Sequence, residues 1–108
     1  MSRDSLGEFE HQVLLAILQR GGESYSVPVV LELEERAGRE VTQAAVFIAL
    51  RRLEEKGLVR SRLLATEEGV GRPRRYFRMT ALGLRRLRES RRALLRLWEG
   101  LDAALDGG

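Results

Sequence analysis

The sequence contains no cysteine, a single histidine and no long apolar run, and each absence excludes a class of protein. Without cysteine, the chain forms neither disulfide bonds nor thiolate metal sites. No apolar stretch approaches the roughly 18 residues of a membrane span. The N-terminal residues, MSRDSLGEFEH, also lack the apolar core of a signal peptide. We therefore expect a cytoplasmic protein that does not interact with a membrane.

The shortage of reactive side chains also argues against catalysis. His11 is the only histidine, and a general base needs an acid, a nucleophile or a metal beside it. At helical spacing from His11, the sequence offers only ordinary glutamates as further metal ligands. Ser24, Ser26 and Ser61 have no discernible base. We expect no enzymatic activity, no metal site and no cofactor, and we place His11 at the surface or in an interface.

What the sequence does contain is a strong separation of charge. Its 108 residues suit one domain, and 44% hydrophobic with 32% charged residues is typical of a globular chain. Residues 1–50 carry a net charge of −4, residues 51–96 carry +10 and residues 97–108 carry −3. A basic block of this size favours a polyanion such as nucleic acid as partner, whereas solubility alone would be served by mixed signs.

The spacing of apolar residues predicts three helices in the first half of the chain. Residues 6–20 form an apolar stripe, and Pro28 fits the first turn of a second helix that ends at Gly38. Thr42 is suited to cap a third helix, which Gly57 terminates. The first half of the chain is therefore expected to be helical.

The apolar period then changes from helical to alternating. LVRSRLL at 58–64 and RRYFRM at 74–79 are predicted to form two strands, joined by the loop ATEEGVGRP. Thr80 then suits the cap of a long helix over residues 81–104. The second half is therefore expected to be a hairpin followed by one helix.

Three helices, a hairpin and a final helix make a mainly α fold with a small β-hairpin. This order is the winged helix-turn-helix arrangement, in which the hairpin is the wing and the third helix enters the major groove of DNA. We expect one compact domain overall, with residues 1–80 as the winged-helix DNA-binding part and residues 81–108 as a long C-terminal dimerisation helix.

The predicted wing carries an unusual concentration of arginine. Four arginines crowd the segment GVGRPRRYFRMT, where one or two would keep an edge strand soluble. Arg72, Arg74 and Arg75 are therefore predicted to neutralise phosphates or to enter a narrow minor groove, with a merely charged edge strand as the weaker alternative. Tyr76 and Phe77 alternate across the strand, so we expect one to pack on the core and leave open which.

Three segments of the chain match a known family: LGEFEHQVLLAIL, AAVFIALRRLEEKGLVRS and GRPRRYFRMTALG. With these segments in this order and spacing, the chain resembles PadR-type transcriptional regulators of the short subclass over nearly its whole length. The resemblance implies a dimeric repressor with a palindromic operator, whose long C-terminal helix crosses into the partner subunit. The chain departs from the family at Phe47, where tyrosine is usual, and at Arg51, a position that is often acidic or polar.

The third helix presents a second face opposite Val46, Leu50 and Leu53, which carries Gln43, Ala44, Phe47 and Arg51. Glutamine bonds adenine and arginine bonds guanine in a bidentate manner, and the N-terminal end of a recognition helix enters the groove deepest. The residue types alone leave open a solvated helix face; the resemblance favours DNA contact, with Arg51 on phosphate. The residues predicted to contact DNA are Thr42, Gln43, Ala44, Phe47, Arg51, Arg72, Arg74 and Arg75.

The last helix carries an apolar seam at alternating spacings of three and four residues, which exceeds what a compact monomer needs. Arg91 interrupts the seam and is expected to pair with a glutamate of the partner. We predict a homodimer whose interface also includes the first helix. Its predicted members are Phe9, Val13, Ile17, Leu87, Arg91, Leu94, Trp98, Leu101 and Leu105.

Trp98 has two interpretations. A tryptophan in a helix more often packs in the core or at a dimer interface. The segment LWEGLD, however, is similar to the corresponding part of multidrug-responsive PadR-type repressors. That resemblance implies paired tryptophans across the dimer axis that hold planar hydrophobic ligands with the help of a carboxylate. Trp98 and Asp102, one helical turn apart, would then bind a small planar aromatic or cationic effector.

Two functions remain open on the sequence. The first is a homodimeric repressor that binds a palindrome in double-stranded DNA and is released by an aromatic ligand at the dimer interface. The second is a winged-helix scaffold whose basic face docks an acidic protein and which has no operator. Binding to duplex DNA across a range of salt concentrations distinguishes the two.

Overall fold

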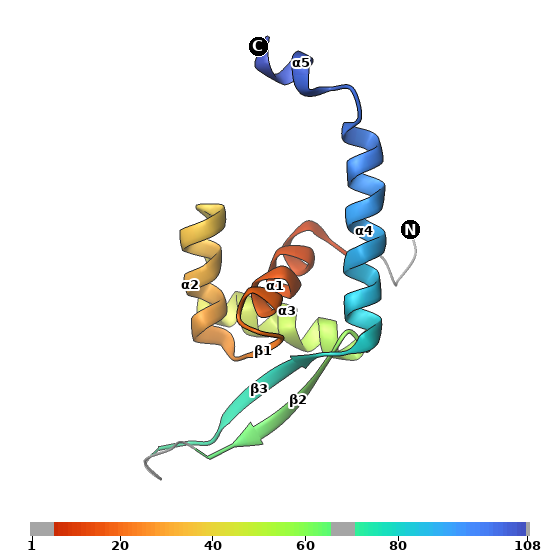
Figure 1. The fold of residues 1–108 in the computed structure, drawn as a ribbon. Coiled ribbons are helices and arrows are strands. Elements are labelled where there is room, and N and C mark those ends of the chain that lie inside the picture. Colours follow the sequence, from red (N-terminus) through yellow and green to blue (C-terminus); the bar gives the residue numbers. More distant parts are fainter. Residues whose placement is uncertain (1–5, 66–70, 108) are drawn as a thin grey trace.

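The structure, a computed structural model, describes residues 6–65 and 71–107 and consists of helices with one small sheet (Figure 1). The helices are α1 (Glu8–Gln19), α2 (Ser26–Ala37), α3 (Gln43–Glu55), α4 (Ala81–Trp98) and α5 (Asp102–Asp106). The strands are β1 (Glu23–Ser24), β2 (Val59–Leu64) and β3 (Arg74–Met79). The predicted fold class is therefore confirmed, with the elements in winged helix-turn-helix order.

The core forms where the first three helices meet the sheet. α1 lies between α2 and α4, and it also contacts α3 and β3 (Figure 1). Ile17 of α1, Leu50 of α3 and Phe77 of β3 have no exposed surface. Full burial of such a side chain stabilises a fold by about 1.5–3 kcal/mol. This shared core holds α3 and the hairpin in a defined relation to each other.

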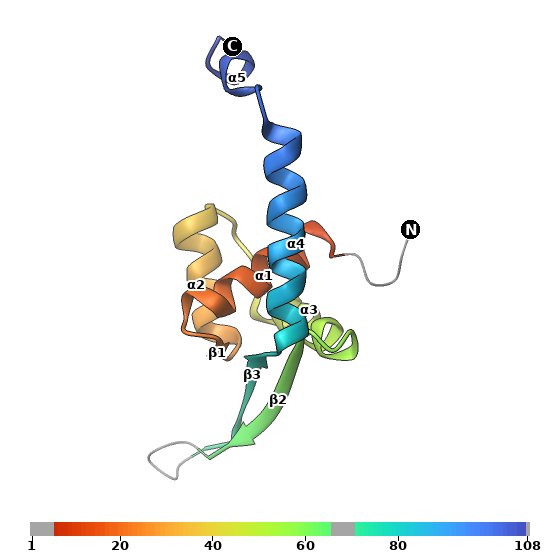
Figure 2. The ribbon, with the colours of Figure 1, turned by 45° about the vertical axis from the view of Figure 1, so that its right-hand side comes forward.

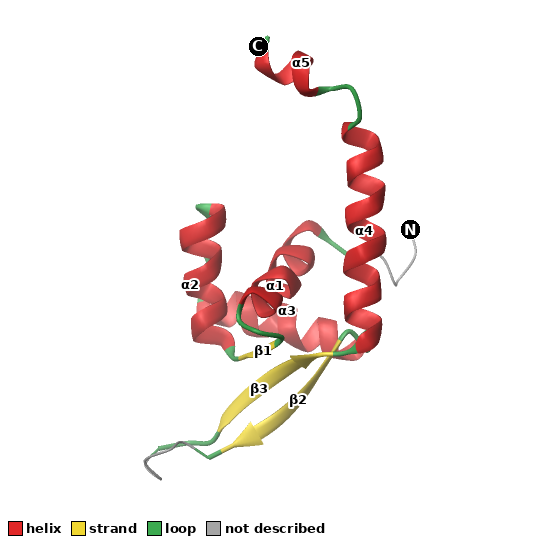
Figure 3. Cartoon of the chain, viewed as in Figure 1, coloured by secondary structure: helices red, strands yellow, loops and turns green. Residues whose placement is uncertain are grey.

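The sheet has three antiparallel strands in the order β1-β3-β2, one strand more than the sequence predicted. β1 adds only two residues, with Ser24 opposite Phe77, and so short a strand leaves no alternating pattern in a sequence. Phe77 turns into the core and Tyr76 stays partly exposed, which settles the question that the sequence left open. Strands β2 and β3 extend away from the helices as the wing (Figure 3); residues 66–70 of the predicted loop lie outside the described residues.

Both predicted threonine caps are present. The side-chain oxygen of Thr42 accepts a hydrogen bond from the backbone N–H of Ala45, and that of Thr80 accepts one from the N–H of Gly83, each at 3.0 Å. A cap of this kind stabilises a helix by about 1 kcal/mol. The two threonines therefore define where the third helix and the last helix begin.

The C-terminal helix is long, as predicted, but its predicted extent over residues 81–104 is wrong. α4 ends at Trp98 rather than continuing to residue 104, and the separate short helix α5 follows. Gly100 has a φ of 75°, a left-handed conformation that glycine adopts without strain, and the chain turns there. Trp98 and Asp102 therefore do not share one face of a continuous helix.

α4 projects from the rest of the molecule, with α5 at its far end (Figure 2). Its first turn is anchored at Gly83, where an added Cβ atom would lie only 2.3 Å from the carbonyl oxygen of Leu58. Beyond Ser90, every residue of α4 is exposed. No helix within the described residues is both long and apolar enough to cross a membrane.

Candidate nucleic-acid interface

A groove of about 660 Å³, here named the α3–wing groove, separates the start of α3 from the wing. Its lining comprises Tyr25, Ser26, Val27, Gln43, Phe47, Leu63, Arg72, Pro73, Arg74 and Arg75. Half of these residues are among those that the sequence predicts to contact DNA. Folding thus brings the third helix and the wing arginines, which are far apart in the chain, to one concave surface.

The start of α3 is open to solvent. Thr42, Gln43 and Ala44 are exposed, and the Gln43 amide donates a hydrogen bond to the Ser26 hydroxyl at 3.1 Å. Although the Thr42 oxygen accepts the capping bond, its hydroxyl hydrogen is still able to donate. Backbone N–H groups and the helix dipole at this end of α3 favour negative charge. The position suits a phosphate or an acceptor on a base edge.

Phe47 is shared between the core and the groove. Its ring meets the buried ring of Phe77 edge-on, with centroids 5.9 Å apart and an interplanar angle of 78°. At the same time, 40% of Phe47 is exposed. The residue is therefore held by an aromatic contact beneath it and presents the rest of its ring to the groove, where it offers apolar contact but no hydrogen bond.

Tyr25 is a groove residue that the sequence did not reveal. The guanidinium carbon of Arg74 lies 4.7 Å from the centre of the Tyr25 ring, within the range of a cation–π contact. The Tyr25 ring in turn lies 5.1 Å from that of Tyr76, at a tilt of 58°. Tyr25 precedes α2, so no local pattern links it to the wing. Its contacts hold Arg74 at the edge of the groove.

A hydrogen-bonded network joins a second wing arginine to α3. Arg75 donates to the Ser61 hydroxyl at 2.9 Å, and that hydroxyl donates to the Glu54 carboxylate at 2.5 Å. The Ser61 backbone N–H also donates to Glu54 at 2.9 Å, and Arg51 forms an ion pair with it at 3.2 Å. The network therefore positions Arg51 and Arg75 through one carboxylate.

The same contacts shift the titration of Glu54. The hydrogen bond from the Ser61 hydroxyl lowers the pKa of Glu54, and burial opposes this change. The Ser61 backbone N–H and the charges of Arg51 and Arg75 lower the pKa further. Glu54 is therefore ionised at neutral pH, and its charge holds the arginines in place.

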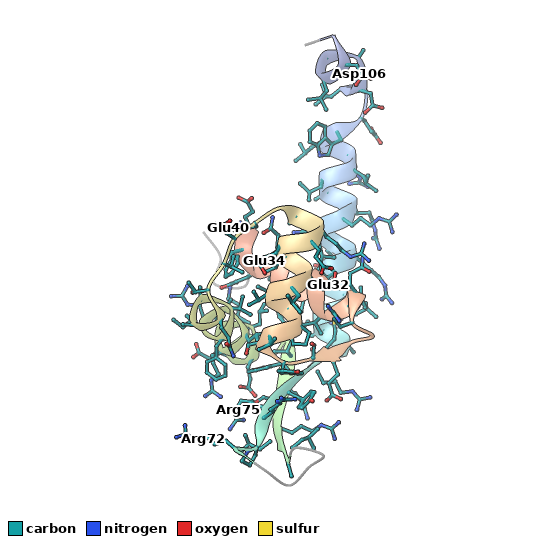
Figure 4. All side chains as sticks on the ribbon, turned by 90° about the vertical axis from the view of Figure 1, so that its left-hand side faces the viewer. Glu32, Glu34, Glu40, Arg72, Arg75 and Asp106 are labelled. Carbon is teal, nitrogen blue, oxygen red and sulfur yellow. The ribbon has the colours of Figure 1, made fainter. Side chains whose placement is uncertain are left out.

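The arginines of the wing and the glutamates of α2 lie on different parts of the molecule. Figure 4 shows Arg72 and Arg75 at the wing, whereas Glu32, Glu34 and Glu40 lie around α2 and the segment after it. Arg72 and Arg74 are exposed. The surface around the α3–wing groove thus offers guanidinium groups, an amide and a helix N-terminus, which together suit a nucleic acid backbone with its base edges.

A family model described as the transcriptional regulator PadR-like family matches residues 14–89, well over half of the chain. The chain belongs to the PadR-like family of transcriptional regulators. The resemblance seen in the sequence is therefore confirmed. Members of this family are transcriptional regulators rather than enzymes, in agreement with the expectation of no enzymatic activity.

Solved structures show the same fold. A PadR family transcriptional regulator from Eggerthella lenta DSM 2243 is 29% identical over 89% of this chain and 82% of that chain, with a TM-score of 0.69. A PadR-like transcription factor from Bacteroides fragilis is 23% identical over 89% and 88%, with a TM-score of 0.73. F93 from STIV, a winged-helix DNA-binding protein, is 10% identical over 89% and 97%, with a TM-score of 0.70. No curated protein matches the chain significantly.

A second groove of this PadR-like regulator, of about 610 Å³, lies between α1 and α4 and contains Trp98. The lining of this α1–α4 groove comprises His11, Leu15, Leu18, Leu84, Leu87, Arg88, Arg91, Leu94, Leu95 and Trp98. Leu15, Leu18, Leu94 and Leu95 are 43–55% exposed, and Trp98 is 48% exposed. Leu101 and Leu105 beyond α4 are exposed as well. Exposed apolar side chains gathered in this way are typical of an interface.

The predicted interface residues on α1 need correction. Val13 and Ile17 cannot contact a partner, because both are fully buried in the core. Phe9 is partly buried, with the Arg39 guanidinium 4.8 Å from its ring centre. The outward-facing residues of α1 are instead Leu15 and Leu18. The run VLLAIL is apolar on every face, so its period did not show which side faces the core.

The predicted interface residues on α4 differ in exposure, and their contact with a partner stays a prediction. Leu87 is only 5% exposed and forms the floor of the α1–α4 groove, while Arg91, Leu94 and Trp98 face it from the exposed part of the helix. His11 lies in the same groove, with its Nδ1 atom 3.4 Å from the Ser90 hydroxyl, and burial lowers its pKa. Among the described residues, no group of three possible metal ligands occurs.

Proposed function

We propose that this PadR-like regulator is a homodimeric repressor that acts in the cytoplasm on a palindromic operator. The main support is the α3–wing groove, in which Gln43 and three arginines face one concave surface. In this proposal the N-terminal end of α3 enters the major groove, while the wing follows the phosphate backbone or enters the adjacent minor groove.

Different side chains would perform different tasks on the DNA. Gln43 and Ala44, at the N-terminal end of α3, would reach deepest into the major groove. There a glutamine amide bonds adenine and an alanine methyl group contacts the thymine methyl group. Arg51, further along α3, would contact phosphate together with the wing arginines. Because Arg74 and Arg75 are already held by Tyr25 and by Ser61, they lose little conformational freedom on binding.

Dimerisation would place two such grooves side by side. The exposed leucines of the α1–α4 groove and of the end of α4 support an interface there, because burying them removes apolar surface from water. A two-fold dimer presents its recognition helices about one turn of DNA apart, roughly 34–36 Å, and so reads a palindrome.

An effector would act at the same interface. A small planar aromatic molecule stacked between the Trp98 rings of two protomers would change the spacing of the recognition helices and release the operator. The structure does not favour the cationic ligand that Asp102 implied, because Asp102 is outside this groove and Arg88 with Arg91 line it. A neutral hydrophobic ring is therefore the better guest.

The decisive experiment compares two variants on DNA from the region upstream of the protein's own gene and on a random duplex. Arg74→Ala combined with Arg75→Ala is expected to weaken binding to both duplexes. It is also expected to reduce the slope of log affinity against log salt concentration by about 2, one for each lost phosphate contact. Gln43→Ala is expected to remove discrimination of about 1–3 kcal/mol at one base pair of each half-site.

Arg96→Ala is the matched control, because Arg96 is an exposed arginine at the distant end of α4. It is expected to leave both affinities nearly unchanged. An unchanged salt slope in the double arginine variant would contradict DNA binding through the wing. Tight binding of an acidic protein with no measurable binding to duplex DNA would instead favour a scaffold.

A further inference from the structure

The exposed surface of α3 consists of two parallel rows of side chains, because residues four positions apart lie on the same side of a helix. The row nearer the wing comprises Gln43, Phe47 and Arg51, and the second row comprises Ala44, Ile48 and Arg52. All of these side chains are exposed. The sequence predicted the whole first row to contact DNA but only Ala44 of the second row, so Ile48 and Arg52 have no assigned role.

Ile48 is the most exposed large apolar side chain of α3. It is 54% exposed, compared with 40% for Phe47, whose ring packs against Phe77. A single exposed isoleucine is ordinary on a protein surface, so its position matters more than its exposure. Ile48 lies one turn beyond Ala44, on the helix whose N-terminal end is proposed to enter the major groove.

The space beside the second row is open. A groove of about 430 Å³, here named the α1–α3 groove, separates this row from the start of α1. Its lining comprises Gly7, Glu8, Phe9, Glu10, Ala45, Ile48, Ala49 and Arg52. Glu10 forms an ion pair with Lys56 at 2.5 Å, and Glu8 lies 3.9 Å from Arg39. Because each glutamate has a cation beside it, their charges are partly balanced and do not exclude a phosphate.

The two rows end in arginines that differ in their contacts. Arg51 pairs with Glu54 at 3.2 Å, whereas Arg52 forms no ion pair within residues 6–65 and 71–107. Arg52 is therefore able to bind a phosphate without giving up an existing partner. A helix in the major groove has a sugar–phosphate strand on each side. Since the wing lies beyond the first row, Arg52 is suited to the strand on the other side.

We propose that Ile48 is a specificity-determining residue, which contacts the methyl group of a thymine in each operator half-site while Arg52 binds a phosphate beside it. The thymine methyl is the apolar group that base edges present in the major groove. Isoleucine forms no hydrogen bond there and discriminates by burying that methyl group. The proposal rests on the entry of α3 into the major groove proposed above, and it names a base that this entry alone does not specify.

Replacement of thymine by deoxyuridine tests the contact, because the two bases differ only in the methyl group. The full-length chain first selects its preferred site from duplexes with randomised positions. Each thymine of that site is then replaced by deoxyuridine, one position at a time in both half-sites. At one position, the replacement is expected to weaken binding of the native chain about fourfold per half-site, the factor that corresponds to one buried methyl group. With Ile48→Ala, the same replacement is expected to have almost no effect.

Two further variants separate base reading from folding and from charge. Leu31→Ala removes an apolar side chain of α2 that is 44% exposed and lies outside the α3–wing and α1–α3 grooves, and it is expected to keep the deoxyuridine effect. Arg52→Ala is expected to lower the slope of log affinity against log salt concentration by about one on every duplex, whereas Ile48→Ala leaves the slope unchanged. All three side chains are exposed, so the variants are expected to fold, as circular dichroism would verify.

The possible failures are distinguishable. Equal deoxyuridine effects at every position in the native chain and in Ile48→Ala would overturn the role of Ile48, as would a selected site without any sensitive thymine, and in both cases the proposed function stands. An unchanged salt slope in Arg52→Ala would overturn the phosphate contact. If the native chain selects no site and binds no duplex, the proposed function fails together with this inference.

Discussion

Among single residues, Glu54 makes more contacts than a surface glutamate usually makes. It accepts hydrogen bonds from the hydroxyl and the backbone N–H of Ser61, and it pairs with Arg51. Through Ser61 it also orients Arg75. A single carboxylate thus connects α3 to the wing, and its charge contributes to the strength of that connection.

The ionised form of Glu54 is expected to contribute to stability. Its pKa is lowered below the ordinary 4.5, so this contribution is complete above about pH 4.5 and is lost as the pH falls through the lower folded value. Glu54→Gln should therefore reduce the free energy of unfolding by about 0.5–1.5 kcal/mol at pH 7. The difference from the native chain should shrink as the pH falls below 4.5.

Urea unfolding of both chains between pH 7 and pH 3 measures this difference. Glu55→Gln, at the exposed neighbouring position of α3, is the control and should have a smaller effect at neutral pH. A Glu54→Gln deficit that stays constant down to pH 3 would show that the carboxylate charge is not what joins α3 to the wing.

At the scale of elements, the junction between α4 and the chain before β2 depends on one glycine. The N–H of Gly83 donates to Thr80, and its Cα faces the backbone of Leu58 so closely that no side chain fits. Because α4 makes few other contacts with the body of the molecule, this turn sets the direction of the whole helix.

Gly83→Ala is expected to destabilise the fold by about 1–3 kcal/mol, because the new Cβ atom would overlap backbone rather than a side chain that is able to move. Gly7→Ala, where no atom lies within 4 Å of the added Cβ, is expected to cost less than about 1 kcal/mol. Thermal unfolding of the two variants measures both values. Equal melting temperatures would mean that α4 adjusts its position without cost.

For the molecule as a whole, the proposed function places DNA binding at the wing and dimerisation along α4. The wing arginines lie at one end and Asp106 at the other (Figure 4). In the proposed function, an effector bound at Trp98 would change the spacing of the recognition helices without contacting the α3–wing groove.

Trp98 is the only tryptophan, so its fluorescence reports on the α1–α4 groove directly. A neutral planar dye is expected to quench it at micromolar concentrations, and a cationic dye of the same ring system more weakly, because Arg88 and Arg91 repel it. Trp98→Leu should abolish dye binding, measured by the dye's own fluorescence, and keep DNA affinity within about threefold, or 0.7 kcal/mol. Stronger quenching by the cationic dye would restore a role for Asp102.

Much of the candidate site followed from the sequence. Gln43, Phe47 and the arginines 72, 74 and 75 were predicted to act together, and the structure places them around one groove. Tyr25 was missed, because its contact with Arg74 joins two segments that share no pattern. The face of α1 was assigned wrongly, because an apolar run such as VLLAIL has no polar side to mark the solvent.

Three helices, the two-stranded wing and both threonine caps could be predicted from the sequence, because each depends on residues within a few positions of one another. The charge separation and the family could be predicted as well, because both depend only on the order of residues along the chain. Only the tertiary structure decided that Phe77 rather than Tyr76 is buried, that β1 joins the sheet and that Leu15 and Leu18 face outwards. Those choices depend on which distant segments pack together, and packing is a property of the whole core rather than of any local stretch.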